Sequence, residues 1–287
     1  MEIVDCSEKS NINQLMSLLI IDSEKSERHY WADIWHYREL FFFLAWRDIL
    51  VRYKQTVIGI LWAVIRPVLT MIVFTIIFGK FAKMPSEGVP YPILVFAAML
   101  PWQFFASSLA ESSNSLISNA NMISKVYFPR LVMPFSSVVV SLVDFLISFV
   151  LLIVLMLFFG VPLTVKLFAL IPLLVVAFLA SFGASLWLAA LNVEYRDFRY
   201  IVPFIVQFGL YVSPVGFSST IVPEKWRMLY SMNPMVGVID GFRWAVTGAE
   251  AQIYWPGFFI SLLVITIMLS GGIWYFRKME RTFADVI

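Results

Sequence analysis

Basic side chains ahead of a long apolar stretch are the residues of this sequence best suited to chemistry. Arg47, Arg52 and Lys54 lie just before the stretch, and Arg66 lies inside it. Arginine suits phosphate because its planar fork donates two parallel hydrogen bonds. These four residues therefore favour the binding of an anionic headgroup. The alternatives are a plain membrane anchor for the first three, and for Arg66 either snorkelling toward the headgroups or a structural pair with Asp144.

Nucleotide, metal and nucleophile motifs are absent from the sequence. Gly79 and Lys80 form the only Gly-Lys pair, and no upstream glycine completes a G-x-x-x-x-G-K-[ST] phosphate loop. His29, His36 and Cys6 are the only histidines and cysteine, too few for a zinc site. We expect no catalytic residue, no metal and no cofactor in this chain. ATP-driven work would therefore need a nucleotide-binding partner, and the net charge of +2 does not indicate nucleic acid.

The composition excludes an ordinary soluble protein. Of the 287 residues, 60% are hydrophobic and 14% charged, and the mean hydropathy is +0.83. Soluble domains are about 45–50% apolar and about 25% charged. The apolar runs are continuous rather than alternating, which favours helices over a transmembrane barrel. The predicted fold class is therefore an all-α integral membrane protein.

Six apolar runs are expected to cross the membrane, because roughly 20 apolar residues span its hydrocarbon core. The fifth run is short and contains proline. Lys and Arg gather in the connections on the side of the N-terminus, which places both termini in the cytoplasm. The expected spans cover residues 57–78, 92–110, 135–159, 167–191, 201–216 and 258–276.

Segments outside the spans complete the predicted organisation. Residues 1–29 form a polar cytoplasmic tail, 30–56 an amphipathic interface helix, 57–278 a six-span transmembrane domain and 279–287 a second tail. In the interface helix, large apolar residues recur on one face, as in helices that lie at headgroup level. These residues are Trp31, Trp35, Phe42, Trp46, Ile49 and Tyr53.

A second amphipathic segment lies between the second and third runs. Leu116, Ala120, Ile123 and Tyr127 recur at helical steps, with polar residues on the opposite side. Pro129 ends any helix there. We expect a short cytoplasmic helix at about residues 115–128. It is either an interfacial helix without a partner or a lever that touches a soluble subunit.

The outer connection, residues 217–257, is long and broken. Pro223 and Pro234 divide it into pieces that are too short to span. Non-helical backbone at membrane depth needs cover from protein or water. Re-entrant helices around a channel mouth satisfy this requirement, and an ordinary external loop is the alternative.

A set of short motifs in a fixed order carries a family resemblance. The motifs are RDILVRYKQT at 47–56, GILW at 59–62, LPW at 100–102, SKVYFPR at 124–130, LNVEYRD at 191–197, MNPM at 232–235 and GFR at 241–243. Together they resemble the membrane (permease) subunit of type-2 ABC exporters of polysaccharides, which move O-antigen, capsule and teichoic-acid polymers. The resemblance covers roughly residues 30–280.

The resemblance implies a permease in the bacterial inner membrane and a specific set of partners. It implies a homodimer of six-span subunits beneath which two copies of a separate ATPase bind ATP and Mg²⁺. The cargo would be a polysaccharide on an undecaprenyl diphosphate lipid, and no nucleic acid takes part. An ABC permease for a lipid or drug is the alternative. A membrane transferase acting on lipid-linked sugars is a further alternative, but it would need convergent acids or a metal site.

The resemblance also suggests roles for individual residues. Arg47, Arg52, Lys54 and Arg66 are candidates for the lipid diphosphate. The coupling helix that contacts the ATPase would include Leu116, Asn119, Ile123, Lys125, Tyr127, Phe128 and Arg130. Flat aromatic rings that hold sugar faces weakly would line the channel and its outer gate, and the candidates are Trp62, Trp102, Tyr211, Phe217, Trp226, Tyr230, Phe242 and Trp244.

Overall fold

The fold is an elongated bundle of helices. The computed structural model describes residues 26–54, 59–86, 88–195, 197–248 and 253–283, and these ranges contain helices and connections but no strand. Five helices are long and apolar enough to cross a membrane. They are α4 (Gly59–Phe74) with its π-helical continuation η1 (Thr75–Phe81), α5 (Tyr91–Ser118), α7 (Val132–Phe158), α8 (Leu170–Glu194), preceded by η2 (Val165–Ala169), and α12 (Trp255–Glu280).

The expected fifth span is a shorter helix than the others. It is α9 (Phe198–Val212), which has 15 residues and stops before Ser213, where the backbone becomes extended. At about 1.5 Å per residue such a helix covers roughly 22 Å, less than a hydrocarbon core of about 30 Å. The described residues therefore provide five helices long enough to span and one short apolar helix, where six spans were expected with the fifth one short.

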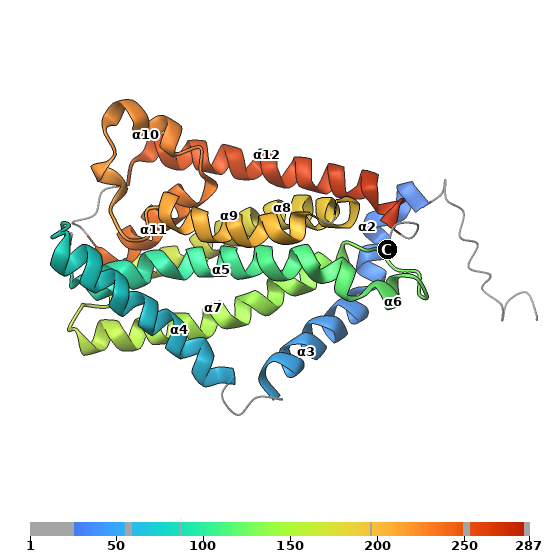
Figure 1. Ribbon diagram of the computed structural model, residues 1–287, viewed down its shortest axis with the longest axis horizontal. Helices are drawn as coiled ribbons and strands as arrows, with labels where there is room; N and C mark the ends of the chain where they lie inside the picture. The colour runs from blue at the N-terminus through green and yellow to red at the C-terminus, as the bar shows by residue number, and fades with distance from the viewer. Residues whose placement is uncertain (1–25, 55–58, 87, 196, 249–252, 284–287) are drawn as a thin grey trace, which may run out of the picture.

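Helix α5 forms the centre of the bundle. It runs through the middle of Figure 1 and packs against α4, α7, α8, α9 and α11. Residues 93–102 of α5 are all buried, as expected for a helix that is apolar on every side. Helices α8 and α12 approach closely at Gly183 and Gly272, where a Cβ on Gly272 would lie 2.7 Å from the carbonyl oxygen of Gly183. Small residues permit such close contact between membrane helices.

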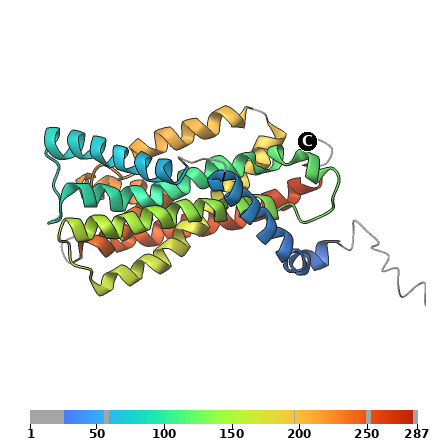
Figure 2. The ribbon, with the colours of Figure 1, turned by 90° about the horizontal axis from the view of Figure 1, so that it is seen from below.

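The two ends of the bundle differ. At one end, here called the α6 end, lie α2 (Ser26–His36), α6 (Ala120–Ile123) and the end of α12 (Figure 1). At the other, the α11 end, lie η3 (Ser219–Ile221), α10 (Glu224–Tyr230) and α11 (Pro234–Thr247). Helix α3 (Arg38–Lys54) crosses the bundle obliquely, as Figure 2 shows.

Two expected helices have different bounds in the structure. The helix expected over 30–56 is two helices, α2 and α3, which meet at Tyr37, and positions 55 and 56 lie outside the described residues. The helix expected over 115–128 is the end of α5, the short α6 and a loop. Helix α5 continues through the polar run, and within it Ser113 and Ser115 satisfy their hydroxyls by donating to carbonyls three residues earlier.

Candidate functional site

A polar cavity lies between α3, α4, α5 and α7. Its volume is about 360 Å³. Two arginines, Arg52 and Arg66, line it together with the carboxylates Glu111 and Asp144. Its other lining residues are Tyr53, Trp62, Ala63, Leu100, Gln103, Phe104, Ser107, Ser141, Phe145 and Ser148. Charged groups gathered between membrane helices mark a candidate binding or transport site.

The Arg52 guanidinium is the centre of the charged group. Its Nη1 donates to Asp144 Oδ2 at 2.6 Å, and its Nη2 donates to Glu111 Oε1 at 2.5 Å. The Tyr53 hydroxyl donates to the other oxygen of Asp144. Burial and the hydrogen bond to Asp144 raise the pKa of Tyr53, so its hydroxyl keeps the proton that it donates. The cavity wall therefore carries an arginine already satisfied by two carboxylates.

Arg66 has a different partner from the one considered from the sequence. Its guanidinium lies over the Trp62 ring, 5.3 Å from the ring centroid, and its side chain is exposed. The carboxylate of Asp144 is instead held by Arg52 and Tyr53, so the structural pair of Arg66 with Asp144 is wrong. The reason is that α3 folds back against α7 and delivers Arg52 to Asp144, while Arg66 remains at the cavity wall.

The other two basic candidates lie apart from the cavity lining. Arg47 donates to Asp48 at 2.7 Å and to the side-chain oxygen of Asn119 at 3.1 Å. This contact ties α3 to the residue that follows α5. Lys54 is the last residue of α3 and is exposed. The structure therefore brings together two of the four basic candidates, Arg52 and Arg66, and adds the carboxylates.

The expected coupling residues divide into an inner and an outer set. Leu116, Ile123 and Phe128 are buried against the bundle. Lys125 and Tyr127 are exposed at the tip of the loop between α6 and α7. An apolar inner set and a polar outer set are what a segment needs in order to present a surface while it remains anchored. The main-chain N–H of Arg130 donates to a carboxylate oxygen of Glu280.

The expected channel aromatics also fall into two sets. Trp102 and Phe242 are core residues: Trp102 packs on Gly209, and Phe242 lies edge-on to Phe145 with 6.1 Å between ring centroids. Lys166 lies over the ring of the half-buried Trp244. Trp62, Tyr211 and Trp226 expose about half or more of their surface, whereas Phe217 and Tyr230 are half-buried.

Arg243 holds the broken backbone that follows α9. It is 2% exposed, and its guanidinium donates to the carbonyl oxygens of Phe217 at 2.6 Å and Val215 at 3.1 Å. The Tyr91 hydroxyl donates to the carbonyl of Gly216 between them at 2.6 Å. Non-helical residues leave carbonyls without helical partners, and buried carbonyls need donors. The sequence predicts no role for Arg243 beyond its place in the GFR motif, because its carbonyl partners lie 26 and 28 positions away.

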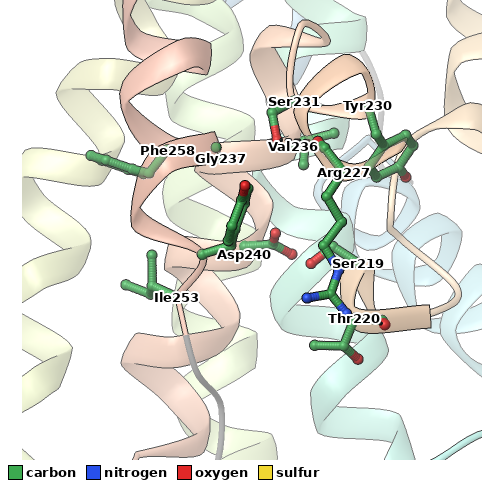
Figure 3. A pocket seen from close by; sticks show the side chains of 12 residues that line it. Ser219, Thr220, Arg227, Tyr230, Ser231, Val236, Gly237, Asp240, Ile253 and Phe258 are labelled. Carbon is green, nitrogen blue, oxygen red and sulfur yellow. Dashed lines mark hydrogen bonds between the residues drawn. The ribbon is translucent and has the colours of Figure 1, made fainter. Parts of the chain in front are cut away.

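A second, smaller cavity lies at the α11 end. Its volume is about 140 Å³, and Figure 3 shows Asp240 pointing into it between α11 and the start of α12. Arg227 extends along the wall toward Ser219 and Thr220, where its Nη2 donates to the Thr220 carbonyl at 2.9 Å. Burial and the nearby Asp240 raise the pKa of Tyr230 on the same wall. Within the described ranges, no group of three His, Cys, Asp or Glu side chains is placed to hold a metal ion.

Five apolar helices of spanning length define the class, a helical membrane protein, and comparison with known proteins gives its family. The profile of the ABC-2 type transporter family matches residues 39–247. The chain therefore belongs to the ABC-2 type transporter family and is a membrane-spanning transport subunit. The resemblance seen in the motifs is confirmed.

Curated relatives match along most of their length. The chain is 29% identical to the O-antigen export system permease protein RfbA of Klebsiella pneumoniae, over 84% of this chain and 92% of that protein. It is 30% identical to the protein of the same name in Myxococcus xanthus, over 74% and 81%. It is 22% identical to the polysialic acid transport protein KpsM of Escherichia coli, over 70% and 78%.

Proposed function

We propose that this chain is the permease subunit of an ATP-driven ABC transporter that exports undecaprenyl-diphosphate-linked polysaccharide, similar to O-antigen, across the bacterial inner membrane. The observation that carries the proposal is the match to O-antigen export permeases over most of both chains. In this proposal both termini lie in the cytoplasm, and two copies of the chain form the channel. ATP and Mg²⁺ are bound by two copies of a separate ATPase.

The polar cavity supports recognition of a lipid diphosphate. Arg66 is an exposed residue of its lining, and Arg52 lines the same cavity with a guanidinium that already binds two carboxylates. A diphosphate offers the same kind of acceptor oxygens as those carboxylates and carries more charge. The headgroup would therefore bind Arg66 first and compete with Glu111 for the outer side of Arg52. Trp62 beside Arg66 provides a flat apolar surface for the first sugar or the lipid.

The exposed loop between α6 and α7 supports an ATPase partner. Lys125 and Tyr127 project from it, while Ile123 and Phe128 anchor it in the bundle. A soluble subunit that binds this loop acts on α5 and α7 together, because the loop joins them. The carboxylates on α5 and α7, Glu111 and Asp144, then move relative to Arg52 on α3.

Exposed apolar faces support a second copy of the chain. Helix α4 exposes Leu61, Leu69, Ile72 and Val73, and α9 exposes Phe204, Phe208 and Tyr211. The two cavities described above, within one subunit, are too small to pass a polymer. A symmetric dimer provides a wider path between its copies. The exposed aromatic rings of α9 would then contact passing sugars weakly and without fixed register.

The proposal is tested in the native host by deletion of the gene and complementation. Loss of surface polysaccharide with its accumulation inside the cell is the expected result, and the wild-type chain together with its ATPase should restore it. Arg66→Ala should abolish restoration, whereas Arg66→Lys should restore part of it because the charge remains. Lys80→Ala is the matched control, since Lys80 is also an exposed cation of the first span.

Two results would contradict the proposal. Surface polysaccharide that is undiminished in the deletion strain would exclude polysaccharide as the cargo. Unchanged polysaccharide with an altered lipid composition or drug tolerance would favour the alternative, an ABC permease for a lipid or drug. Restoration by Arg66→Ala at the level of Lys80→Ala would remove Arg66 from the headgroup site.

A further inference from the structure

Three segments that are far apart in the sequence meet at Glu280, the last residue of α12. Its Oε2 accepts a hydrogen bond of 2.8 Å from the hydroxyl of Tyr30 in α2. Its Oε1 accepts one of 2.7 Å from the main-chain N–H of Arg130, which follows the loop after α6. Figure 1 shows α2, α6 and the end of α12 at the same end of the bundle. One carboxylate therefore joins α2, the α6–α7 loop and α12.

Arg130 and Arg277 add further contacts to this junction. The Arg130 guanidinium donates to the main-chain carbonyl of Glu280 and lies over the ring of Phe283, 6.0 Å from its centroid. The Arg277 guanidinium lies over the ring of Tyr30 at 4.6 Å. Tyr30 and Phe283 are buried. Hydrogen bonds to a charged acceptor and cation–π contacts are strong in buried surroundings, so the junction is held firmly.

The junction lies directly behind the exposed part of the loop. Residues 124–127 are exposed, Phe128 is buried, and Arg130 with its two bonds to Glu280 follows after Pro129. Proline restricts the backbone on both of its sides, so the chain between the exposed tip and Arg130 is short and stiff. A displacement of the tip therefore reaches Glu280 with little loss. From Glu280 the displacement can pass to two helices, to α12 directly and to α2 through Tyr30.

We propose that Glu280 is a positioning residue that makes the α6–α7 loop, α2 and α12 move as one unit when a partner acts on the loop. The inference rests on the proposed function only for the identity of that partner, an ATPase. Without the carboxylate, the loop would still act on α5 and α7, but α2 with the attached α3 would no longer follow it. Since α3 carries Arg52, the junction links the docking loop to the charged cavity by a second route besides α5 and α7.

The joint behaviour of the segments is measured by hydrogen exchange on the permease alone in lipid nanodiscs. In Glu280→Ala, the amides of α2 and of residues 123–131 should both exchange about tenfold faster, since a lost buried hydrogen bond to a charge has this order of effect. The amides of α11, far from the junction, should not change. Glu280→Gln should behave like the wild type, because its amide oxygen accepts from Arg130 and its NH₂ donates to the Tyr30 hydroxyl. Acceleration in only one of the two segments, or in neither, would overturn the inference.

A milder pair of variants covers the case in which Glu280→Ala disturbs the whole fold. Tyr30→Phe removes only the hydroxyl that bonds Glu280 and should accelerate exchange in α2. Tyr275→Phe is the matched control, because the Tyr275 hydroxyl also donates to a glutamate, Glu194, with 2.9 Å between the oxygens, and Glu194 is not part of the junction. Equal exchange in α2 for the two phenylalanine variants would contradict the role of Glu280.

Coupling is then measured on the permease–ATPase complex in proteoliposomes. Glu280→Ala should keep ATP hydrolysis but export about tenfold less polymer for each ATP, while Glu280→Gln keeps the wild-type ratio. A structural role alone would instead lower hydrolysis and export together. An unchanged amount of polymer exported per ATP in Glu280→Ala would overturn the positioning role of Glu280. A wild-type chain that exports without any ATPase would refute the proposed function, and the exchange experiment would still report on the junction.

Discussion

Arg52 at the end of α3 and Asp144 in the middle of α7 form an ion pair in which Nη1 lies 2.6 Å from Oδ2. Both side chains are about three-tenths exposed, so the pair lies at the edge of the polar cavity rather than in bulk water. A carboxylate in an apolar helix is costly unless it is paired. Pairing with Arg52 therefore offsets the cost of placing the Asp144 carboxylate in the apolar helix α7. It also fixes α3 against α7.

The pairing leads to a prediction about energetic coupling. Asp144→Asn should destabilise the protein by about 1–3 kcal/mol, because the charge of Arg52 loses a partner. Adding Arg52→Gln should cost less than the sum of the two single changes, by roughly 1 kcal/mol. Asp144→Asn and Arg66→Gln should simply add. Thermal or denaturant unfolding in detergent measures all of these, and strict additivity for Arg52 and Asp144 would contradict the pair.

The hydrogen bonds from Arg243 to the backbone after α9, here called the Arg243 clamp, give a second prediction. Arg243→Met removes two hydrogen bonds from the carbonyls of Val215 and Phe217 while it keeps the length of the side chain. We expect a loss of roughly 2–3 kcal/mol in stability and faster proteolysis at residues 213–222. Lys225→Met is the control, since Lys225 is an exposed cation, and it should change stability by less than about 0.5 kcal/mol. Equal stability of the two variants would show that the clamp contributes little.

The packing of α9 on α5 gives a third prediction. A Cβ on Gly209 would lie 2.5 Å from the Trp102 ring. Gly209→Ala should therefore destabilise the protein by about 1 kcal/mol, although alanine by itself favours a helix by about the same amount. In a Trp102→Phe background the smaller ring leaves room, and the same alanine should be neutral or stabilising. Unfolding midpoints of the four proteins check this, and destabilisation in both backgrounds would contradict the contact.

The exposed loop gives a fourth prediction. Tyr127→Ala, combined with Lys125→Ala, should leave stability within about 0.5 kcal/mol of the wild type because both side chains are exposed. The same change should weaken binding of the ATPase subunit at least about tenfold, since interface aromatics often contribute more than 1 kcal/mol each. Ile123→Ala, on the buried side, should instead lower stability by about 2–4 kcal/mol. Unfolding and binding measured on the same preparations separate the two effects.

The spans and the class of protein were largely predictable. The runs at 92–110, 135–159 and 258–276 lie within or beside α5, α7 and α12, because a continuous apolar run is a local property of the chain. The end of α5 was not predictable from polarity, since Ser113 and Ser115 satisfy their hydroxyls within the helix and remain buried. The π-helical end of the first span likewise has no signal in composition.

The sequence predicted that the candidate site contains basic residues, but not which residues surround them. The affinity of the basic residues for anions follows from their residue type, and Arg52 and Arg66 line one cavity. Sequence analysis did not find that Glu111 and Tyr53 join Arg52, or that Phe242 is a core residue. Helical spacing shows which residues share a face, but the rotation of one helix against the next decides whether that face meets a neighbour, a cavity or lipid.

The sequence by itself determined that this chain is a helical membrane permease, because the length of apolar runs and the order of short motifs are local properties of the chain. Only the tertiary structure decided which charges meet. Asp144 binds Arg52 rather than Arg66, and Glu280 binds Tyr30, which lies 250 positions away. Such contacts depend on how helices cross and turn against one another, and those angles come from the packing of the whole bundle.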